Sequence, residues 1–301
     1  ARARPMDKKR LVEALQRRGE VVAVTGDGTN DAPALKAAHV GLSMGDGTSV
    51  AKEVSDITII DNSFSSIGRA VMWGRSLYQN IQRFLLFQLT VNVSACLLVL
   101  VGAFMGVQSP LTVTQMLWVN LIMDTFGAMA LASLPPSPEV MKCKPRNRKA
   151  FIIDRQMGVE IFGIGGLFFL IMLVMLYVCE HADIHHMTDF LHCTLGPKDG
   201  LNADEQTLLF SVFVMTHFWY MFNARAFRTG RSALHLQGCK GFGLIAAVIL
   251  IGQVLIVEVM YKFFDVAPMS LEDWGIITLA SSLVLWVREG YIWLSGRNQR
   301  A

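Results

Sequence analysis

Long apolar stretches dominate the chain from about residue 84 onward, and polar connections separate them. A helix needs about 20 mainly apolar residues to cross the hydrocarbon core of a bilayer. Six stretches come near that length, so the pattern predicts an α-helical bundle of six membrane spans within residues 84–301. Their ranges are about 84–107, 112–134, 158–179, 207–222, 241–261 and 274–294. The fourth and sixth are the weakest, and Arg288 and Glu289 interrupt the end of the sixth.

The first 63 residues are more polar and contain only short apolar segments. Met6–Arg18 has the periodicity of a helix and ends at Gly19, a residue that often terminates helices. Three further segments are predicted to be strands, and a short helix is predicted between the first and second of these strands. The strands are expected at 20–24, 39–43 and 56–60, and the helix at 31–38. Strands that alternate with helices predict a parallel α/β sheet.

Residues 64–83 are predicted to form a stalk helix between the α/β domain of residues 1–63 and the membrane domain of residues 84–301. The helix is expected to continue from Ser63 to about Val107. Some 44 residues at 1.5 Å each give a rod of about 66 Å. We expect such a rod to transmit movement from the α/β domain to the membrane, and a helix break near Gly74 would weaken that expectation.

Charge patterning predicts the orientation of this integral, multi-pass membrane protein. The chain has 301 residues, is 52% hydrophobic and carries a formal net charge of +3. Basic residues crowd the second and fourth connections, whereas the third has one lysine and six acidic residues: the basic residues are Lys142, Lys144, Arg146, Arg148, Lys149, Arg225, Arg228, Arg231 and Lys240. The positive-inside rule then places both termini in the cytoplasm. No basic patch interleaved with stacking aromatics occurs in a polar segment, so no nucleic-acid partner is expected.

Asn120 and Asp124 are polar residues inside the second apolar stretch. Their spacing of four places both side chains on one face of a helix, one above the other. A carboxylate at mid-membrane costs roughly 2.5–3.5 kcal/mol, so it needs a purpose or a partner. The pair indicates a cation site, and the alternative is an aspartate that hydrogen-bonds to a neighbouring helix for packing.

A second polar motif, the run from Thr25 to Asp31 (Thr-Gly-Asp-Gly-Thr-Asn-Asp), follows the first predicted strand. Parallel α/β sheets bind their ligands at the carboxyl ends of the strands. Gly26 and Gly28 permit unusual backbone angles and close approach. Asp27 and Asp31, with Asn30 between them, offer the hard oxygen ligands that Mg²⁺ takes beside substrate phosphates.

The longer run from Thr25 to Lys36 resembles the corresponding motif of the P-type cation-transporting ATPases, whose phosphorylation domain has the haloacid-dehalogenase fold. Further motifs extend the resemblance over nearly the whole chain, and the closest likeness is to the plasma-membrane type (type IIB) calcium pumps. These motifs are Met44-Gly45, Val50–Glu53, Ser55–Ile57, Ala70–Arg75, Phe87–Val93, Gln115–Phe126, Phe213–Met215 and Asn223–Arg225. The resemblance implies a partial haloacid-dehalogenase-like domain in residues 1–63, followed by a membrane domain.

The resemblance also implies roles for the residues of the first motif. Asp27 matches the carboxylate that binds Mg²⁺ at the phosphorylation site, and Asn30 and Asp31 complete that corner. Thr25, Gly26 and Gly28 form the loop beside the bound phosphate. Lys8 matches the lysine held against the phosphoryl group, with Lys9 as the alternative one register away. ATP would bind to a domain that lies outside this sequence.

Asn92, Asn120 and Asp124 match the family's ligands for the transported Ca²⁺. Calcium takes 6–8 oxygen ligands, and these side chains supply at most four, so other groups must complete the shell. Ala95 and His217 stand where two-site pumps place glutamates, which implies one Ca²⁺ per cycle. His217 is expected to be either a packed helix histidine or a proton-sensitive group near the site.

The family's Asp-Lys-Thr-Gly-Thr phosphorylation motif is absent from the sequence. We therefore expect the chain to be the carboxyl-terminal third of a pump in a plasma or internal membrane, with the amino-terminal part as its partner. Alone it should neither form the phosphoenzyme nor transport ions. The alternatives are a truncated, non-catalytic pump, a membrane half that binds a partner, and a pump for another divalent cation such as Mn²⁺. No calmodulin-binding tail follows the last predicted span.

The third connection is rich in histidine and contains two cysteines, Cys179 and Cys193, on or near the exoplasmic side. A disulfide between them is possible. The histidines are His181, His185, His186 and His192. They suggest either an exoplasmic metal site or, as the favoured interpretation, a solvated loop.

Overall fold

The structure is a computed structural model, and it describes residues 3–107, 110–147, 149–198, 200–229, 232–236 and 238–298. Arg148 and Arg231, two of the basic residues used to predict the orientation, lie outside the described residues, as do the last three residues of the chain. The chain divides into two compact units. The first comprises Ala1–Ser76 and Pro136–Ala150, and the second comprises Leu77–Pro135 and Phe151–Ala301.

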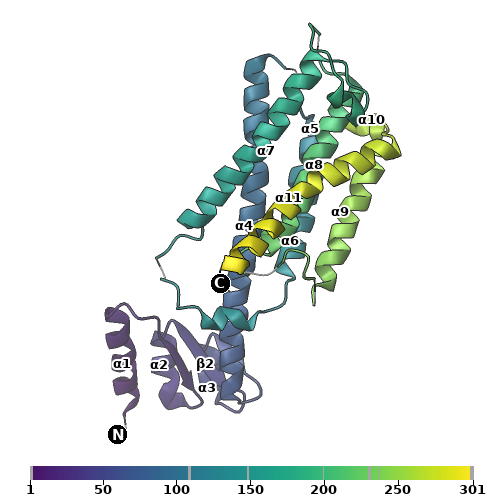
Figure 1. Ribbon diagram of the computed structural model, residues 1–301. Coiled ribbons are helices and arrows are strands. Elements are labelled where there is room, and N and C mark those ends of the chain that lie inside the picture. Colours follow the sequence, from purple (N-terminus) through teal and green to yellow (C-terminus); the bar gives the residue numbers. More distant parts are fainter. Residues whose placement is uncertain are drawn as a thin grey trace. The chain divides into compact units, whose positions relative to one another are not determined.

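The first unit is built on a parallel three-stranded sheet with the order β1-β2-β3 (Figure 1). Short helices connect the strands, so the predicted α/β pattern is confirmed. The elements are α1 (Pro5–Arg17), β1 (Ala23–Gly26), η1 (Thr29–Asp31), α2 (Ala32–Ala37), β2 (Val40–Met44), α3 (Ser49–Val54), β3 (Ile57–Ile59) and, in the second segment of this unit, η3 (Pro138–Lys142). The buried apolar side chains of the sheet and of α1, α2 and α3 are Val12, Ala34, Leu35, Leu42, Ala51 and Ile59, and Val140 of η3 is also buried.

Two local features of this unit differ from the sequence prediction. The first strand begins at Ala23, whereas the apolar pattern predicted Glu20. Just before the strand, the N–H of Val22 donates to Nδ1 of His39 at 3.1 Å and its carbonyl accepts the N–H of His39 at 2.9 Å; periodicity does not reveal the side-chain contact. The helix α3 was not predicted; it has six residues, and its N-cap Thr48 accepts a hydrogen bond from the N–H of Ala51.

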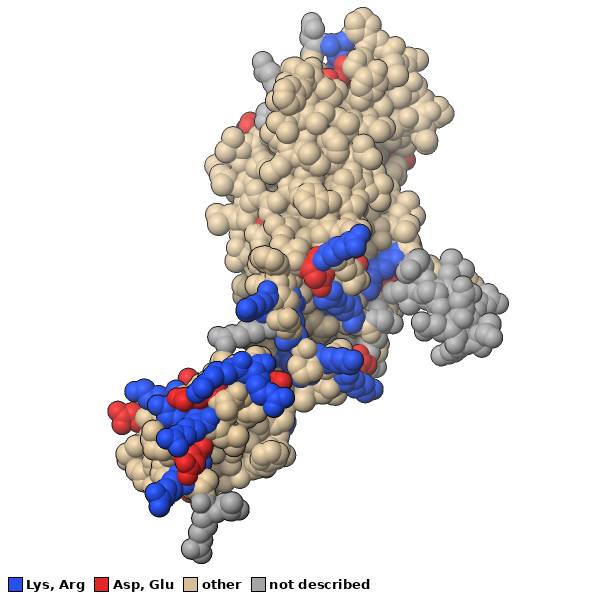
Figure 2. All heavy atoms as spheres, turned by 90° about the vertical axis from the view of Figure 1, so that its left-hand side faces the viewer, with Lys and Arg blue, Asp and Glu red and all other residues tan. Residues whose placement is uncertain are grey.

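The second unit is helical. Its elements are α4 (Phe64–Met105, which begins in the first unit), α5 (Val113–Leu117), η2 (Trp118–Met123), α6 (Asp124–Ala132), α7 (Arg155–His181), η4 (Met187–Leu191), α8 (Ala203–Arg225), α9 (Lys240–Glu258), α10 (Tyr261–Phe264) and α11 (Leu271–Asn298). α4 is one uninterrupted helix that continues through Gly74. On the face of this unit seen in Figure 2, a broad area lacks charged side chains, as expected of a surface in contact with lipid.

Among the described residues, four helices are long and apolar enough to cross a membrane: α4, α7, α8 and α9. The chain is therefore a membrane protein, but the predicted six spans are not confirmed. The second predicted span is divided into α5, η2 and α6, and the sixth lies within α11, which contains Arg288 and Glu289. Both remain predictions.

α8 was among the weakest predicted spans, and its surroundings explain why. Within its most apolar window, 89% of the helix is buried inside the protein, against 33–39% for the other three candidate spans. α8 packs against α7, α9 and α11. A helix surrounded by protein does not need the uniform hydrophobicity that lipid demands, so Ser211 and His217 are tolerated at fully buried positions.

Candidate functional site

The first candidate site lies at the end of β1, where the chain passes through Gly26, Asp27 and Gly28 into η1 and α2. Asp31 folds back onto this loop, and its Oδ2 accepts a hydrogen bond from the N–H of Gly28 at 3.4 Å. A Cβ at Gly26 would lie 2.4 Å from the Cβ of Asp31, closer than two carbon atoms can approach. Only glycine at position 26 therefore leaves room for the side chain of Asp31 to lie against the end of β1.

Lys8, on α1, points at this loop. Its Nζ lies 2.6 Å from Oδ1 of Asp31, whereas the Nζ of Lys9 lies 3.6 Å from Oε1 of Glu13, one turn along the same helix. Of the two lysines that the sequence left in competition, Lys8 thus faces the loop. Partial burial raises the pKa of Asp31, but the hydrogen bonds from Lys8 and from the N–H of Gly28 outweigh it, so that the pKa lies below its usual value. Asp31 is therefore held as a carboxylate beside a cation.

Thr25, Asp27 and Asn30 expose their side chains at this edge of the sheet. No group of three or more His, Cys, Asp or Glu side chains within the described ranges is placed to hold a metal ion. Mg²⁺ in phosphate sites needs only one or two carboxylates, because phosphate oxygens and waters supply the remaining ligands. The exposed carboxylate of Asp27 and the carboxylate of Asp31, which bonds to Gly28 in the same loop, match that number.

A second Gly-Asp-Gly-Thr sequence, residues 45–48, follows β2, and the sequence analysis gave it no role. The repetition of the tetrapeptide was the signal that could have revealed it. The N–H of Thr48 donates to the carbonyl of Asp27 at 2.7 Å, so the second loop supports the backbone of the first. Asp46 itself is hydrogen-bonded to Asn62 through both backbone and side chain. Only the first copy thus presents an exposed aspartate beside a lysine-bound carboxylate.

The second candidate site lies in the α5–η2–α6 segment. Here the expected regular helix is wrong: residues Trp118–Met123 form a π-helical turn, and α6 begins at Asp124. Such turns carry one extra residue and often mark functional sites. Asn120 is exposed, whereas Asp124 is buried with 4% of its surface accessible. The two side chains are therefore in different environments, although they are only four residues apart.

Neither carboxylate oxygen of Asp124 has a hydrogen-bond partner in the described structure. The alternative interpretation, an aspartate paired with a neighbouring helix for packing, is therefore not supported. Burying an ionised carboxylate without compensation is costly. A carboxylate left without donors inside a helical bundle is suited to a cation as its partner.

Three contacts show that α4 runs antiparallel to this segment. Asn80 donates to the carbonyl of Leu134 at 3.1 Å, a Cβ on Gly127 would touch the ring of Phe87, and one on Gly102 would touch Pro110. Asn92 lies between the second and third contacts on α4, and Asn120 and Asp124 lie between the same two contacts on the opposing segment. The three predicted cation ligands therefore come from the same depth of the bundle.

His217, on α8, is fully buried. Its Nδ1 bonds to the carbonyl of Phe213 at 2.7 Å, and its ring packs edge-on against Phe168 at 5.2 Å between ring centres. The ring is thus packed in the manner of a helix histidine, whereas its buried Nε2 has no hydrogen-bond partner among the described residues.

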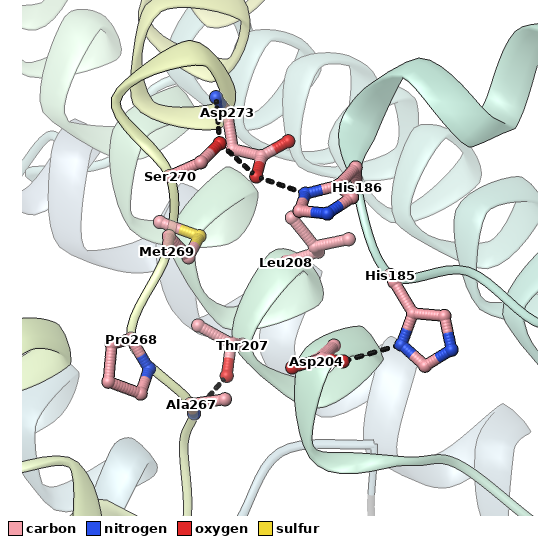
Figure 3. A pocket seen from close by; sticks show the side chains of 10 residues that line it. All are labelled: His185, His186, Asp204, Thr207, Leu208, Ala267, Pro268, Met269, Ser270 and Asp273. Carbon is pink, nitrogen blue, oxygen red and sulfur yellow. Dashed lines mark hydrogen bonds and ion pairs between the residues drawn. The ribbon is translucent and has the colours of Figure 1, made fainter.

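Two of the four histidines of the third connection, His185 and His186, are paired with carboxylates around a cavity of about 70 Å³ (Figure 3). Nδ1 of His185 lies 2.6 Å from Oδ2 of Asp204, and Nδ1 of His186 lies 2.9 Å from Oδ2 of Asp273. The suggested exoplasmic metal site is wrong for the described part of the chain, because no metal-binding group occurs there. Cys179 and Cys193 are free thiols, so the possible disulfide is not formed in this structure.

Comparisons with known proteins show the family to which the chain belongs. Residues 108–294 match the family model described as cation transporting ATPase, C-terminus, and residues 8–71 match that of haloacid dehalogenase-like hydrolase. Putative calcium-transporting ATPase 13, plasma membrane-type, of Arabidopsis thaliana is 40% identical over 291 residues, which cover 95% of this chain and 27% of that protein. Plasma membrane calcium-transporting ATPase 2 of Oreochromis mossambicus is 41% identical over 286 residues, 91% of this chain and 25% of that protein.

Plasma membrane calcium-transporting ATPase 1 of Mus musculus is 38% identical over 299 residues, 95% of this chain and 24% of that protein. The chain thus spans about a quarter of the length of these relatives. The family model for the carboxyl-terminal region covers more than half of the chain, and its matched range contains the helices from α5 to α10 and the buried Asp124. The chain belongs to the cation-transporting ATPases, and over nearly its whole length it is similar to plasma-membrane-type calcium-transporting ATPases.

Proposed function

We propose that the chain is the carboxyl-terminal part of an ATP-driven pump that moves Ca²⁺ out of the cytoplasm. The observation that carries the proposal is Asp124, a buried carboxylate without hydrogen-bond partners, placed at the end of a π-helical turn in a membrane unit. The similarity to calcium-transporting ATPases over 95% of the chain supports Ca²⁺ as the cargo. Mn²⁺ remains the competing cargo, because oxygen ligands accept both ions.

In the membrane unit, Asn92, Asn120 and Asp124 supply at most four oxygens toward the six to eight that Ca²⁺ takes. The exposed side chain of Asn120 points to a face that this chain does not cover, where further ligands of the longer protein can approach. Ala95 is fully buried and its side chain carries no oxygen, and the ring of His217 is packed inside the bundle. With no carboxylate at either position, we propose one Ca²⁺ per cycle.

In the first unit, Asp27 and Asp31 would hold Mg²⁺ beside the phosphoryl group. The ion, when bound, neutralises the negative charge of the phosphate. Lys8 places a second positive charge at the same corner, and its contact with Asp31 orients it before any phosphate arrives. The loop of Thr25, Gly26 and Gly28 allows the phosphate to approach the backbone. The amino-terminal part of the longer protein would contribute the ATP-binding domain and the phosphorylated aspartate, so that this chain alone should be inactive.

The topology that accompanies this proposal has both termini in the cytoplasm and the third connection outside, in a plasma or internal membrane. Accessibility of Cys143 and Cys193 to a membrane-impermeant thiol reagent tests it: in sealed cells Cys193 should react and Cys143, which is exposed in the second connection, should not. The reverse pattern would contradict the proposed orientation.

The substitution Asp124→Asn in the full-length protein tests the proposed cargo site. Removing the charge while keeping the shape should abolish Ca²⁺-dependent phosphoenzyme formation from ATP. Glu272→Gln, which neutralises an exposed carboxylate in the first turn of α11, is the matched control and should leave it intact. A normal calcium affinity in Asp124→Asn would refute the site. If the unaltered protein forms phosphoenzyme in Mn²⁺ but not in Ca²⁺, the competing cargo is correct. No phosphoenzyme with either cation would favour a non-catalytic role.

A further inference from the structure

Trp118 and Gln253 form a hydrogen bond between two elements of the membrane unit. Trp118 is the first residue of the π-helical turn, and its Nε1–H donates to Oε1 of Gln253, on α9, at 3.0 Å. Gln253 is fully buried and Trp118 is 8% exposed. The amide nitrogen of Gln253 has no partner among the described residues. The glutamine thus sits at an energetically unfavourable position in which its one satisfied group is the acceptor for Trp118.

The indole is also seated against the backbone of α9. A Cβ at Gly252 would lie 2.7 Å from Cη2 of Trp118 and 3.2 Å from Cζ2. Both are ring atoms of a rigid, buried side chain, so they cannot swing aside as the tip of a flexible chain would. Glycine at 252 and glutamine at 253 therefore act together: the first makes room for the ring, and the second orients its N–H.

These contacts lie at one end of the segment that carries Asn120 and Asp124. The other end is held where Gly127 lies against the ring of Phe87 of α4. Between the two anchors the chain makes its π-helical turn, which has one more residue than an α-helical path would have. The carboxylate of Asp124 has no hydrogen bond to hold it in place. The positions of the two side chains in space therefore depend on where the anchors hold the ends of the turn.

We propose that Trp118 and Gln253 are positioning residues: by fixing the start of the π-helical turn on α9, they set the placement of Asn120 and Asp124 for the transported cation. This inference rests on the proposed function for its readout. A tryptophan that merely filled space would affect protein stability, whereas a positioning residue affects the apparent affinity for the cation at an unchanged maximal rate.

The test is a double-mutant cycle in the full-length protein, with Ca²⁺-dependent ATP hydrolysis measured in membranes. Trp118→Phe removes the N–H, and Gln253→Leu removes the acceptor at nearly constant volume. Each should raise the Ca²⁺ concentration for half-maximal activity about threefold, the factor that corresponds to an average interhelical hydrogen bond in a membrane. The double variant should show no larger shift than either single variant, because both remove the same bond.

Gly252→Ala tests the seating of the ring independently of the hydrogen bond, and it should raise the half-maximal Ca²⁺ concentration by threefold or more. Combining it with Trp118→Phe removes the atoms that clash, so the shift should return to that of Trp118→Phe alone. Gly243→Ala, on the same helix but facing open space, is the matched control and should leave the affinity unchanged.

The outcomes separate this inference from the proposed function. The positioning role would be overturned if the increases in half-maximal Ca²⁺ concentration multiplied in the variant that combines Trp118→Phe with Gln253→Leu. A reduced maximal rate at unchanged Ca²⁺ affinity would also overturn it. Unchanged affinity in Gln253→Leu would also overturn it, even if that variant is less thermally stable. Absence of Ca²⁺-dependent hydrolysis in the unaltered protein would instead refute the proposed function.

Discussion

Lys198 and Glu205 form a buried ion pair in the third connection, and the free energy lost when the pair is broken can be predicted. Glu205 is fully buried, and its carboxylate accepts hydrogen bonds from Lys198 and from the N–H groups of Ile184 at 3.0 Å and Asn202 at 2.8 Å. The side chain of Lys198 is 19% exposed. The pair therefore ties the end of α7 and the following loop to the first turn of α8.

Replacing Lys198 with methionine keeps the length of the side chain and removes its charge. Leaving one charge of a buried pair without its partner typically costs 3–5 kcal/mol. The two N–H donors remain, and the lysine is partly exposed, so we expect the lower end, about 3 kcal/mol. At 1.36 kcal/mol per factor of ten, this corresponds to a roughly 150-fold increase in local opening.

Hydrogen exchange reports that opening directly, because the amide of Ile184 donates to Glu205. In Lys198→Met the exchange of this amide should accelerate roughly 150-fold. The double variant Lys198→Met/Glu205→Gln leaves no buried charge at this position. The free energy of local opening should therefore fall by only about 1 kcal/mol, the scale of one neutral hydrogen bond. Lys262→Met, at an exposed lysine of α10, is the control and should not alter the exchange. An Ile184 amide that exchanges within twofold of the unaltered protein in Lys198→Met would refute the reasoning.

Two further predictions concern the other charged contacts. Lys8→Ala should lower phosphoenzyme formation at least tenfold in the full-length protein, while Lys9→Ala should change it less than twofold; equal effects of the two would contradict the geometry at the sheet edge. The hydrogen bond and charge of Asp273 raise the pKa of His186. Because the pKa is raised, the contact between His186 and Asp273 stabilises the fold fully below the ordinary histidine pKa of about 6.5. This stabilisation is lost as pH rises through the raised value. The amide of Met187, which donates to Asp273 at 2.7 Å, should therefore lose protection over that interval after correction for intrinsic exchange. In His186→Gln the protection should not vary with pH there, and a pH dependence that persisted in this variant would exclude the histidine as its source.

Local patterns were enough to predict much of the fold. The alternation of short apolar runs and helices predicted the parallel sheet of the first unit, because each run is long enough to cross the sheet once and too short to be a helix. The long helix α4 was predicted from continuous helical sequence, and the structure shows it from Phe64 to Met105. Continuous hydrophobicity located the helices α7 and α9 because lipid-facing helices must be apolar on most of their surface.

The sequence likewise indicated both candidate sites, since residue types and short spacings carry that information. A glycine–aspartate loop at the end of a strand and a carboxylate inside an apolar run are each visible without a structure. Their assigned roles, at Asp27 and Asp124 and at the residues around them, remain predictions. What the sequence could not give is which polar neighbours each side chain meets.

Those neighbours come from parts of the chain far apart in sequence, and only the tertiary structure decided them. It placed Lys8 and not Lys9 on Asp31, paired His185 and His186 with carboxylates, and brought Gln253 to Trp118 across 135 positions. The π-helical turn also depends on distant parts of the chain. An α-helical turn is the locally preferred conformation, so packing against neighbouring helices has to offset the cost of the π-helical one. The sequence by itself determined where the chain is apolar and where it carries ligands, since both depend on residues close together. The placement of those ligands depends on how the helices pack, and periodicity along one segment contains no information about the segments beside it.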